Sequence, residues 1–227
     1  MWRRALWLYS APRRAFSPPL THSTWIVALA VLFVVLFAQA VLVRDLVAEK
    51  QRPFIESNDR IPEERKEEIL ARMQSPENYA VLSVIGTVVQ LLFGYIIPAL
   101  LFLFGLNFVL ASSTTFKEVL SVTSLCGLAL IPGDLLRTPL MLAKGTLDVY
   151  TSPAAFADPN NLPLVFALNR FDIFELYRLV LLALGLSVLA RQSTKRTAIL
   201  VGIVWLIFGL IGFGSVKLSS AFSQGAH

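Results

Sequence analysis

The sequence predicts an all-α polytopic membrane protein, folded as a bundle of five transmembrane helices. Of its 227 residues, 56% are hydrophobic and only 15% are charged, which is more apolar surface than one water-soluble core of ordinary proportions buries. Five apolar stretches approach or exceed the roughly 20 residues that cross a hydrocarbon layer about 30 Å thick. A backbone in lipid must satisfy its own hydrogen bonds, so each stretch is predicted to be a helix. The expected spans are residues 24–43, 80–110, 118–136, 172–190 and 197–216.

The region before the first span, residues 1–23, is short and basic. Basic residues beside a membrane helix are typical of its cytoplasmic side. A cleaved signal peptide is the alternative, because Ala38-Gln39-Ala40 resembles a cleavage site. The apolar run starts late and continues past that site to Arg44, so we predict an uncleaved anchor. The basic residues of this region are Arg3, Arg4, Arg13 and Arg14.

A polar connection, residues 44–79, follows the first span. It holds seven Lys/Arg and nine Asp/Glu. The part from Ile61 to Met73 has the composition of a helix, with acidic and basic residues at spacings that allow neighbours on one face to pair. We therefore expect one short solvated or interfacial helix here, ended by Ser75-Pro76.

The second and third spans contain residues that disturb helices. Gly94 and Pro98 lie near the middle of the long second span and predict a tilt or a kink. Pro132-Gly133-Asp134 predicts that the third helix breaks near its end. Residues 137–171, which contain several prolines, are then expected to form a long interfacial loop. A half-helix that dips into the membrane within this loop is an open alternative.

The fourth and fifth spans are separated only by the six polar residues 191–196 and are predicted to form an antiparallel hairpin. Residues 219–227 are expected to be a C-terminal tail. The leader and the 191–196 turn carry the densest basic clusters, and five spans place them on one side. The positive-inside rule then predicts a cytoplasmic N-terminus and an external C-terminus.

Five ionisable residues are expected to converge where the third helix ends and the fourth begins. Two pairs have i,i+3 spacing, which lets opposite charges neutralise each other on a helix face. Charges at membrane depth are costly and often mark a ligand or ion pathway. The competing interpretation is structural, because Asp172 and Glu175 have capping-box spacing and Arg178 can extend toward the interface. The predicted cluster consists of Asp134, Arg137, Asp172, Glu175 and Arg178.

The sequence predicts no catalytic, cofactor-binding or metal-binding residues. Glu67–Arg72 matches the Glu-Glu-x-x-x-Arg pattern of CAAX-type membrane endopeptidases, but those enzymes need histidines within the membrane, and His22 and His227 lie outside the spans. Cys126 is the only cysteine and is expected to pack as a small hydrophobe. The basic residues occur in short runs beside apolar spans, so we expect no nucleic-acid partner.

The fourth span resembles a signature of the Yip-domain family, the Ypt-interacting membrane proteins. Residues 169–187 contain an Asp-x-Phe-x-x-aromatic pattern, a leucine-rich run and Gly-x-Ser. Five spans, a Glu/Arg-rich segment before the second span and a C-terminal hairpin are similar to that family as well, over most of residues 15–218. Glu175 and Arg178 depart from the small or apolar residues expected at their positions. The residues that carry the match are Asp172, Phe174, Tyr177, Gly185 and Ser187.

The resemblance implies a non-enzymatic scaffold or adaptor that organises the lipid bilayer through protein partners or self-association. The long hydrophilic N-terminal region of eukaryotic trafficking members is missing, so the chain is similar to prokaryotic members, and a bacterial inner membrane is the expected location. The link of eukaryotic members to small GTPases is therefore not carried over. The alternative is a small transporter, channel-like or lipid-handling protein that uses the five-residue charged cluster.

Overall fold

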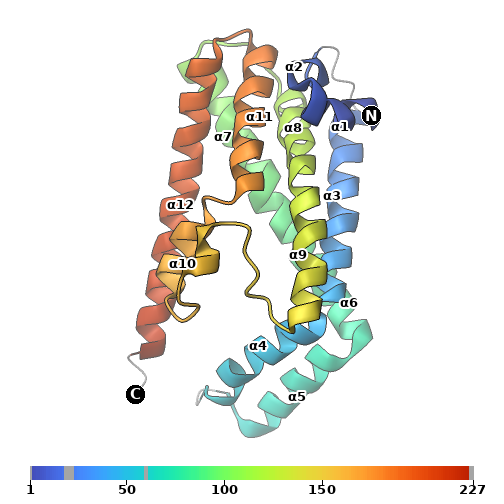
Figure 1. Ribbon diagram of the computed structural model, residues 1–227, viewed down its shortest axis with the longest axis vertical. Helices are drawn as coiled ribbons and strands as arrows, with labels where there is room; N and C mark the ends of the chain where they lie inside the picture. The colour runs from blue at the N-terminus through green and yellow to red at the C-terminus, as the bar shows by residue number, and fades with distance from the viewer. Residues whose placement is uncertain (1, 18–22, 59–60, 225–227) are drawn as a thin grey trace.

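The computed structural model describes residues 2–17, 23–58 and 61–224. These residues form long helices packed side by side, with no strand among them (Figure 1). Five helices are long and apolar enough to cross a membrane, which confirms the all-α, five-span prediction. The spans are Thr24–Leu42, Glu77–Val109, Phe116–Lys144, Ile173–Ala190 and Thr194–Leu218.

The N-terminal region is part of the bundle rather than a simple basic leader. Helix α1 (Trp2–Ser10) and the short α2 (Pro12–Ala15) precede the first span, α3 (Ser23–Leu42). Leu8, Ala15 and Phe16 are almost completely buried. An apolar side chain every few residues among the arginines makes α1 amphipathic, so one face packs on the bundle while Arg3 stays exposed.

The polar connection contains two helices, α4 (Arg44–Glu56) and α5 (Glu63–Gln74), instead of the single predicted helix. They form a helical hairpin at the end of the bundle opposite α1 and α2 (Figure 1). The buried Lys66 ammonium joins them, because its Nζ donates to the Glu56 carbonyl at 2.9 Å and to Glu63 Oε1 at 2.7 Å. The buried Ile55 adds an apolar anchor that the charged composition of α4 conceals.

The second span changes its helical pitch near the predicted disturbance. It consists of two α-helical segments joined by a wider π-helical turn that contains Gly94 and precedes Pro98, and a second π-helical turn ends the span. Proline has no N–H to donate to the carbonyl one turn before it, which disturbs the regular hydrogen-bond pattern of the helix. π-Helical turns inside α-helices often occur at functional sites. The segments are α6 (Pro76–Leu91), η1 (Leu92–Ile96), α7 (Ile97–Phe104) and η2 (Gly105–Val109).

The third span does not end near residue 136, and this prediction was wrong. After α8 (Phe116–Gly127) the chain tightens into a 3₁₀ turn, η3 (Leu128–Leu130), and continues as α9 (Ile131–Lys144). Pro132 lies in the first turn of α9, where its missing N–H has no helical partner to lose. The helix ends instead at Gly145, whose φ of 64° is the left-handed conformation typical of a C-terminal cap.

The predicted interfacial loop is correspondingly shorter. Residues 137–144 belong to α9, and the rest contains a 3₁₀ turn, η4 (Pro153–Phe156), and the helix α10 (Leu162–Asn169). Helix α10 packs against the last helix, as the dipping half-helix of the alternative prediction would. The helices α11 (Ile173–Ala190) and α12 (Thr194–Gln224) form the predicted hairpin. Residues 219–224 of the expected tail therefore belong to α12, and residues 225–227 lie outside the described part of the chain.

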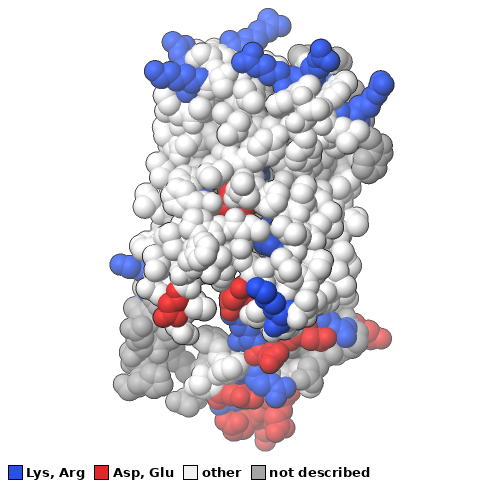
Figure 2. Space-filling view, in the orientation of Figure 1, with Lys and Arg blue, Asp and Glu red and all other residues white. Residues whose placement is uncertain are grey.

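Helix α8 is the centre of the bundle. It packs against α3, α7 and α11, and every residue from Val119 to Gly127 is buried. In the apolar, membrane-length part of the third span, 67% of the residues are buried inside the protein. The corresponding share is 11% in the first and the last spans. The outer helices instead expose apolar side chains over a broad uncharged band (Figure 2). An exposed apolar surface of this extent is the surface that lipid covers.

Candidate functional site

Three of the five predicted residues form a buried ion-paired group that joins α9 to the start of α11. Arg137 Nη2 lies 2.8 Å from Asp134 Oδ1, and Arg137 Nη1 lies 3.1 Å from Asp172 Oδ2. Thr151, in the loop between α9 and α10, donates its hydroxyl to the same Asp172 oxygen. Only 6% of the Asp172 side chain is exposed. We refer to Asp134, Arg137, Thr151 and Asp172 as the charged clamp.

The clamp uses both carboxylate oxygens of Asp172. Oδ2 accepts from Arg137 and Thr151, whereas Oδ1 accepts from the backbone N–H groups of Phe174 and Glu175 at 2.9 and 3.2 Å. Asp172 is thus the N-cap of α11, as its spacing predicted. The full capping box is absent, because the Glu175 side chain turns toward Arg178 instead of its own N-cap.

Glu175 and Arg178 form a second, separate ion pair. Arg178 donates from Nε and Nη2 to the two Glu175 oxygens at 2.8 and 2.6 Å, with 16% of each side chain exposed. Within the described residues no ion pair joins them to the clamp. The five predicted residues therefore form two ion-paired groups instead of one connected network. An α-helix turns by roughly 100° per residue, so Arg178, six residues after Asp172, faces a different side of the bundle.

The Glu175–Arg178 pair faces a cavity of about 390 Å³ between η1, α7, α10, α11 and α12. Its wall also contains Gln90, Gly94 and Arg170, while most of the other lining is aromatic or aliphatic. Figure 2 shows acidic and basic atoms in a recess at mid-height of the otherwise uncharged band. We refer to this space as the intramembrane cavity.

Arg170 was not among the predicted site residues, although it lines the intramembrane cavity. Its guanidinium carbon lies 4.8 Å from the centre of the Trp205 ring, and its Nη2 donates to the Trp205 carbonyl at 2.9 Å. Burial lowers the pKa of Arg170 from its ordinary value, Glu175 opposes that shift and Arg178 adds to it. Arginine is not deprotonated in proteins, so the group is a cation.

The family-like residues on α11 all make packing or hydrogen-bond contacts. A Cβ atom added to Gly133 would lie 2.7 Å from the Phe174 ring, so α9 and α11 approach closely there. A Cβ atom added to Gly185 would lie 2.6 Å from Val122, so this glycine is required where α11 crosses α8. The Ser187 hydroxyl donates to the carbonyl of residue 184 at 2.8 Å.

Tyr177 attaches the N-terminal helix to α11. Its hydroxyl donates to the Leu8 carbonyl at 2.6 Å, and its ring stacks on Tyr9 with the ring centres 5.8 Å apart. The pattern Asp-x-Phe-x-x-aromatic thus places three contacts at the start of one helix: Asp172 caps it, Phe174 packs on α9 and Tyr177 holds α1. These signature residues position the helices of the bundle.

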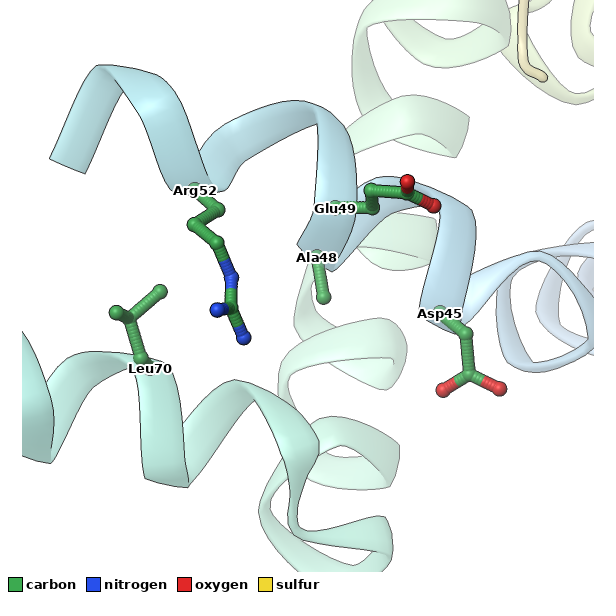
Figure 3. A pocket seen from close by; sticks show the side chains of 5 residues that line it. All are labelled: Asp45, Ala48, Glu49, Arg52 and Leu70. Carbon is green, nitrogen blue, oxygen red and sulfur yellow. The ribbon is translucent and has the colours of Figure 1, made fainter. Parts of the chain in front are cut away.

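The hairpin of α4 and α5 encloses a further groove of about 480 Å³, outside the uncharged band. Asp45, Ala48, Glu49 and Arg52 of α4 line one side, and Leu70 of α5 lines the other (Figure 3). The Arg52 guanidinium points into the space between the two helices. Asp45 pairs with Arg44 at 3.2 Å, whereas no hydrogen bond or ion pair to another described residue involves the Glu49 or Arg52 side chain.

The remaining motif residues have ordinary surroundings. On α5, Arg72 pairs with Glu68 at 2.7 Å on the exposed surface, so the endopeptidase-like run does not face the membrane interior. Cys126 is completely buried in the core. His22 and His227 lie outside the described residues, and among those described no group of three or more His, Cys, Asp or Glu is placed to hold a metal ion.

Comparison with known families identifies one match that covers almost the whole chain. The model of the Yip1 domain matches residues 8–216, from the last turn of α1 to the lipid-facing part of α12. Neither the curated proteins nor the solved structures contain a significant match. The match includes all five spans and the signature residues of α11. This chain therefore belongs to the Yip1-domain family and is an integral membrane protein of that type.

Proposed function

We propose that this protein is a non-enzymatic membrane scaffold or adaptor that acts through protein partners. The observation that carries the proposal is the α4–α5 hairpin, which lies beyond the uncharged band and holds an open groove with charged walls. A groove whose charged side chains include two without partners among the described residues is suited to a polar segment of another protein. Membership of a family whose members are generally not enzymes supports the same function.

The chemistry of the groove defines the partner segment. Glu49 and Arg52 offer one charge of each sign, and Leu70 provides an apolar contact on the opposite helix. A helix or loop that carries a basic and an acidic residue beside an apolar one would complement it, since complementary charges favour the correct partner and disfavour others. The polar connection of another polytopic membrane protein has this character.

The transporter alternative has less support because the predicted charges do not form one path. The charged residues of the clamp pair with one another and hold α9, the following loop and α11 together. Only Glu175 and Arg178 face a cavity. The five residues therefore divide into a structural group and a pair beside a binding space.

The proposed location is a bacterial inner membrane with the N-terminus in the cytoplasm. On the visible face of the molecule, basic side chains alone occupy the end that carries α1 and α2, while the opposite end mixes both signs (Figure 2). This asymmetry is the one that the positive-inside rule associates with a cytoplasmic face. The α4–α5 hairpin would then lie on the external side.

Site-specific photo-crosslinking in native membranes tests the scaffold proposal. A photoreactive residue at Ala48, inside the groove, is expected to yield a discrete protein adduct that disappears in the charge-reversed variant Glu49→Lys/Arg52→Glu. The same label at Glu64, an exposed position on α5 outside the groove, is the control. An adduct that survives charge reversal, or that forms equally at Glu64, would contradict the proposal. So would solute flux into proteoliposomes that contain only this protein.

A further inference from the structure

The residues that line the intramembrane cavity carry a net positive charge and include two buried N–H groups without a partner among the described residues. Its charged lining consists of Arg170, Arg178 and Glu175, so the formal charges sum to +1. Arg178 uses Nε and Nη2 for the bidentate pair and leaves Nη1 outside it. Arg170 Nε is buried and has no hydrogen-bond partner within the described residues, and the same holds for Trp205 Nε1.

A lining with a net positive charge favours a ligand group that carries negative charge. Leaving a buried polar group without a partner is costly, and more so when the group is charged. Arginine is the side chain best matched to phosphate, because its planar fork of N–H groups fits the phosphate oxygens. A single negative charge would also balance the excess +1. The donor set therefore fits a phosphodiester better than it fits a cation or a neutral polar molecule.

The rest of the cavity fits the hydrocarbon part of a lipid. Phe93, Phe166 and Phe208 line it, and the space is open rather than enclosed. Arg178 lies 13 residues before Arg191 on the basic turn, which is roughly 20 Å along the helix axis. In a hydrocarbon layer of about 30 Å this depth is in the leaflet away from the basic end. About 10 Å of hydrocarbon then separates Arg178 from the boundary of that leaflet, a distance that the long arginine side chains and an inward displacement of the headgroup cover together.

We infer that the intramembrane cavity binds the phosphate headgroup of an anionic phospholipid, with Arg170 and Arg178 on the phosphate and the acyl chains along the phenylalanine wall. Glu175 holds the Arg178 guanidinium in place and limits the cavity to one excess positive charge. Binding of this kind goes beyond the scaffold function, since the groove of α4 and α5 is a separate surface.

A steric variant tests this site without removing a charge. Substitution of Arg178 would leave Glu175 unpaired in an apolar environment and could prevent folding. Gly94 lines the cavity, and a Cβ atom added there would meet no atom within 4 Å, so Gly94→Leu fills the space and keeps the ion pair. Gly86 has an equally open position on the same span and does not line the cavity, so Gly86→Leu is the matched control.

The measurement is native mass spectrometry of the full-length protein in detergent, titrated separately with phosphatidylglycerol, phosphatidylcholine and inorganic phosphate. Wild type and Gly86→Leu are expected to retain phosphatidylglycerol in preference to phosphatidylcholine. Gly94→Leu and Arg170→Gln are expected to weaken that binding by about tenfold, the effect of one lost charge-assisted contact. Equal retention of the two lipids, unchanged binding by Gly94→Leu, or displacement of phosphatidylglycerol by inorganic phosphate would overturn the assignment to a lipid headgroup.

Discussion

The charged clamp and the intramembrane cavity are built from the same residue types but have opposite properties. In the clamp, one arginine joins two aspartates from different elements, and the Asp172 oxygens are fully used. In the cavity, Glu175 pairs with Arg178 only, Arg170 has no carboxylate partner among the described residues, and two buried N–H groups remain without partners there. A charge in a membrane bundle therefore does not by itself mark a binding site. The hydrogen-bonding capacity that remains after internal pairing distinguishes the two regions.

The largest expected effect is that of Asp172→Ala in the clamp. This change removes the N-cap of α11 and leaves Arg137 with only Asp134 as a charged partner. Breaking a buried ion pair by removing one partner costs about 3–5 kcal/mol, so thermal unfolding of the purified protein should occur at a much lower temperature. Asp172→Asn should be milder, because asparagine is an equally good N-cap. Equal melting temperatures for wild type and Asp172→Ala would show that the clamp does not stabilise the bundle.

Glu175→Gln should separate stability from binding in the cavity. The neutral amide can still accept from Arg178 but loses the charge, so we expect a loss of about 1–3 kcal/mol in the free energy of unfolding. The formal charge of the cavity rises from +1 to +2, so retention of phosphatidylglycerol should increase. Unfolding by denaturant and native mass spectrometry check the two parts. A stability loss accompanied by weaker lipid binding is the result opposite to this prediction.

Tyr177→Phe should loosen the N-terminal helix with a smaller effect. The variant loses the hydrogen bond to the Leu8 carbonyl, for which we expect about 1 kcal/mol, but keeps a ring beside Tyr9. Hydrogen exchange should become faster in α1 and stay unchanged in α8. Uniform acceleration throughout the bundle would mean that Tyr177 supports the whole fold rather than the attachment of α1.

The smallest expected effect is a pH dependence at the α4–α9 end of the molecule. Lys50 Nζ lies 2.7 Å from Asp148 Oδ1 on a partly exposed surface. Burial alone would raise the pKa of Asp148, but Lys50 and the Tyr150 hydroxyl hold it below its ordinary value. The stabilisation is therefore present above the unfolded pKa of about 3.9 and is lost as the pH falls through the folded value. The melting-temperature difference between wild type and Asp148→Asn should therefore shrink as the pH is lowered from 7 to 3. A difference that stays constant would show that the charge of Asp148 is not its cause.

The sequence predicted the elements that depend on composition and local spacing. Five apolar stretches specify five spans, and the i,i+3 pairs at residues 134/137 and 175/178 are present because both partners lie on one helix. Helix α1 was missed as a structural element because nine residues are too few to span a bilayer, and its burial depends on distant helices. The predicted end of the third span was placed too early because Pro132 lies in the first turn of α9, where a proline does not break the helix.

The partition of the charged residues required tertiary structure. Thr151 joins the clamp from a loop whose path no local pattern specifies. Arg170 precedes α11 and reaches the cavity only because α12 places Trp205 beside it. Which face of α11 each charge occupies follows from the helical rotation, but what packs against that face depends on helices distant in the sequence. Arg170 lies in the loop just before the fourth span, and Trp205 lies in the fifth span. A basic residue before one span, together with a tryptophan in the next, is the sequence signal that could have identified Arg170.

The most direct test of the contrast between the two regions is the rise in melting temperature on adding phosphatidylglycerol to the purified protein. A ligand that binds only the folded state stabilises it in proportion to its occupancy. Asp172→Asn should start from a lower melting temperature and show the full wild-type rise, whereas Gly94→Leu should melt near wild type and show almost no rise. A wild-type rise in Gly94→Leu, or its loss in Asp172→Asn alone, would contradict the division into a structural clamp and a binding cavity.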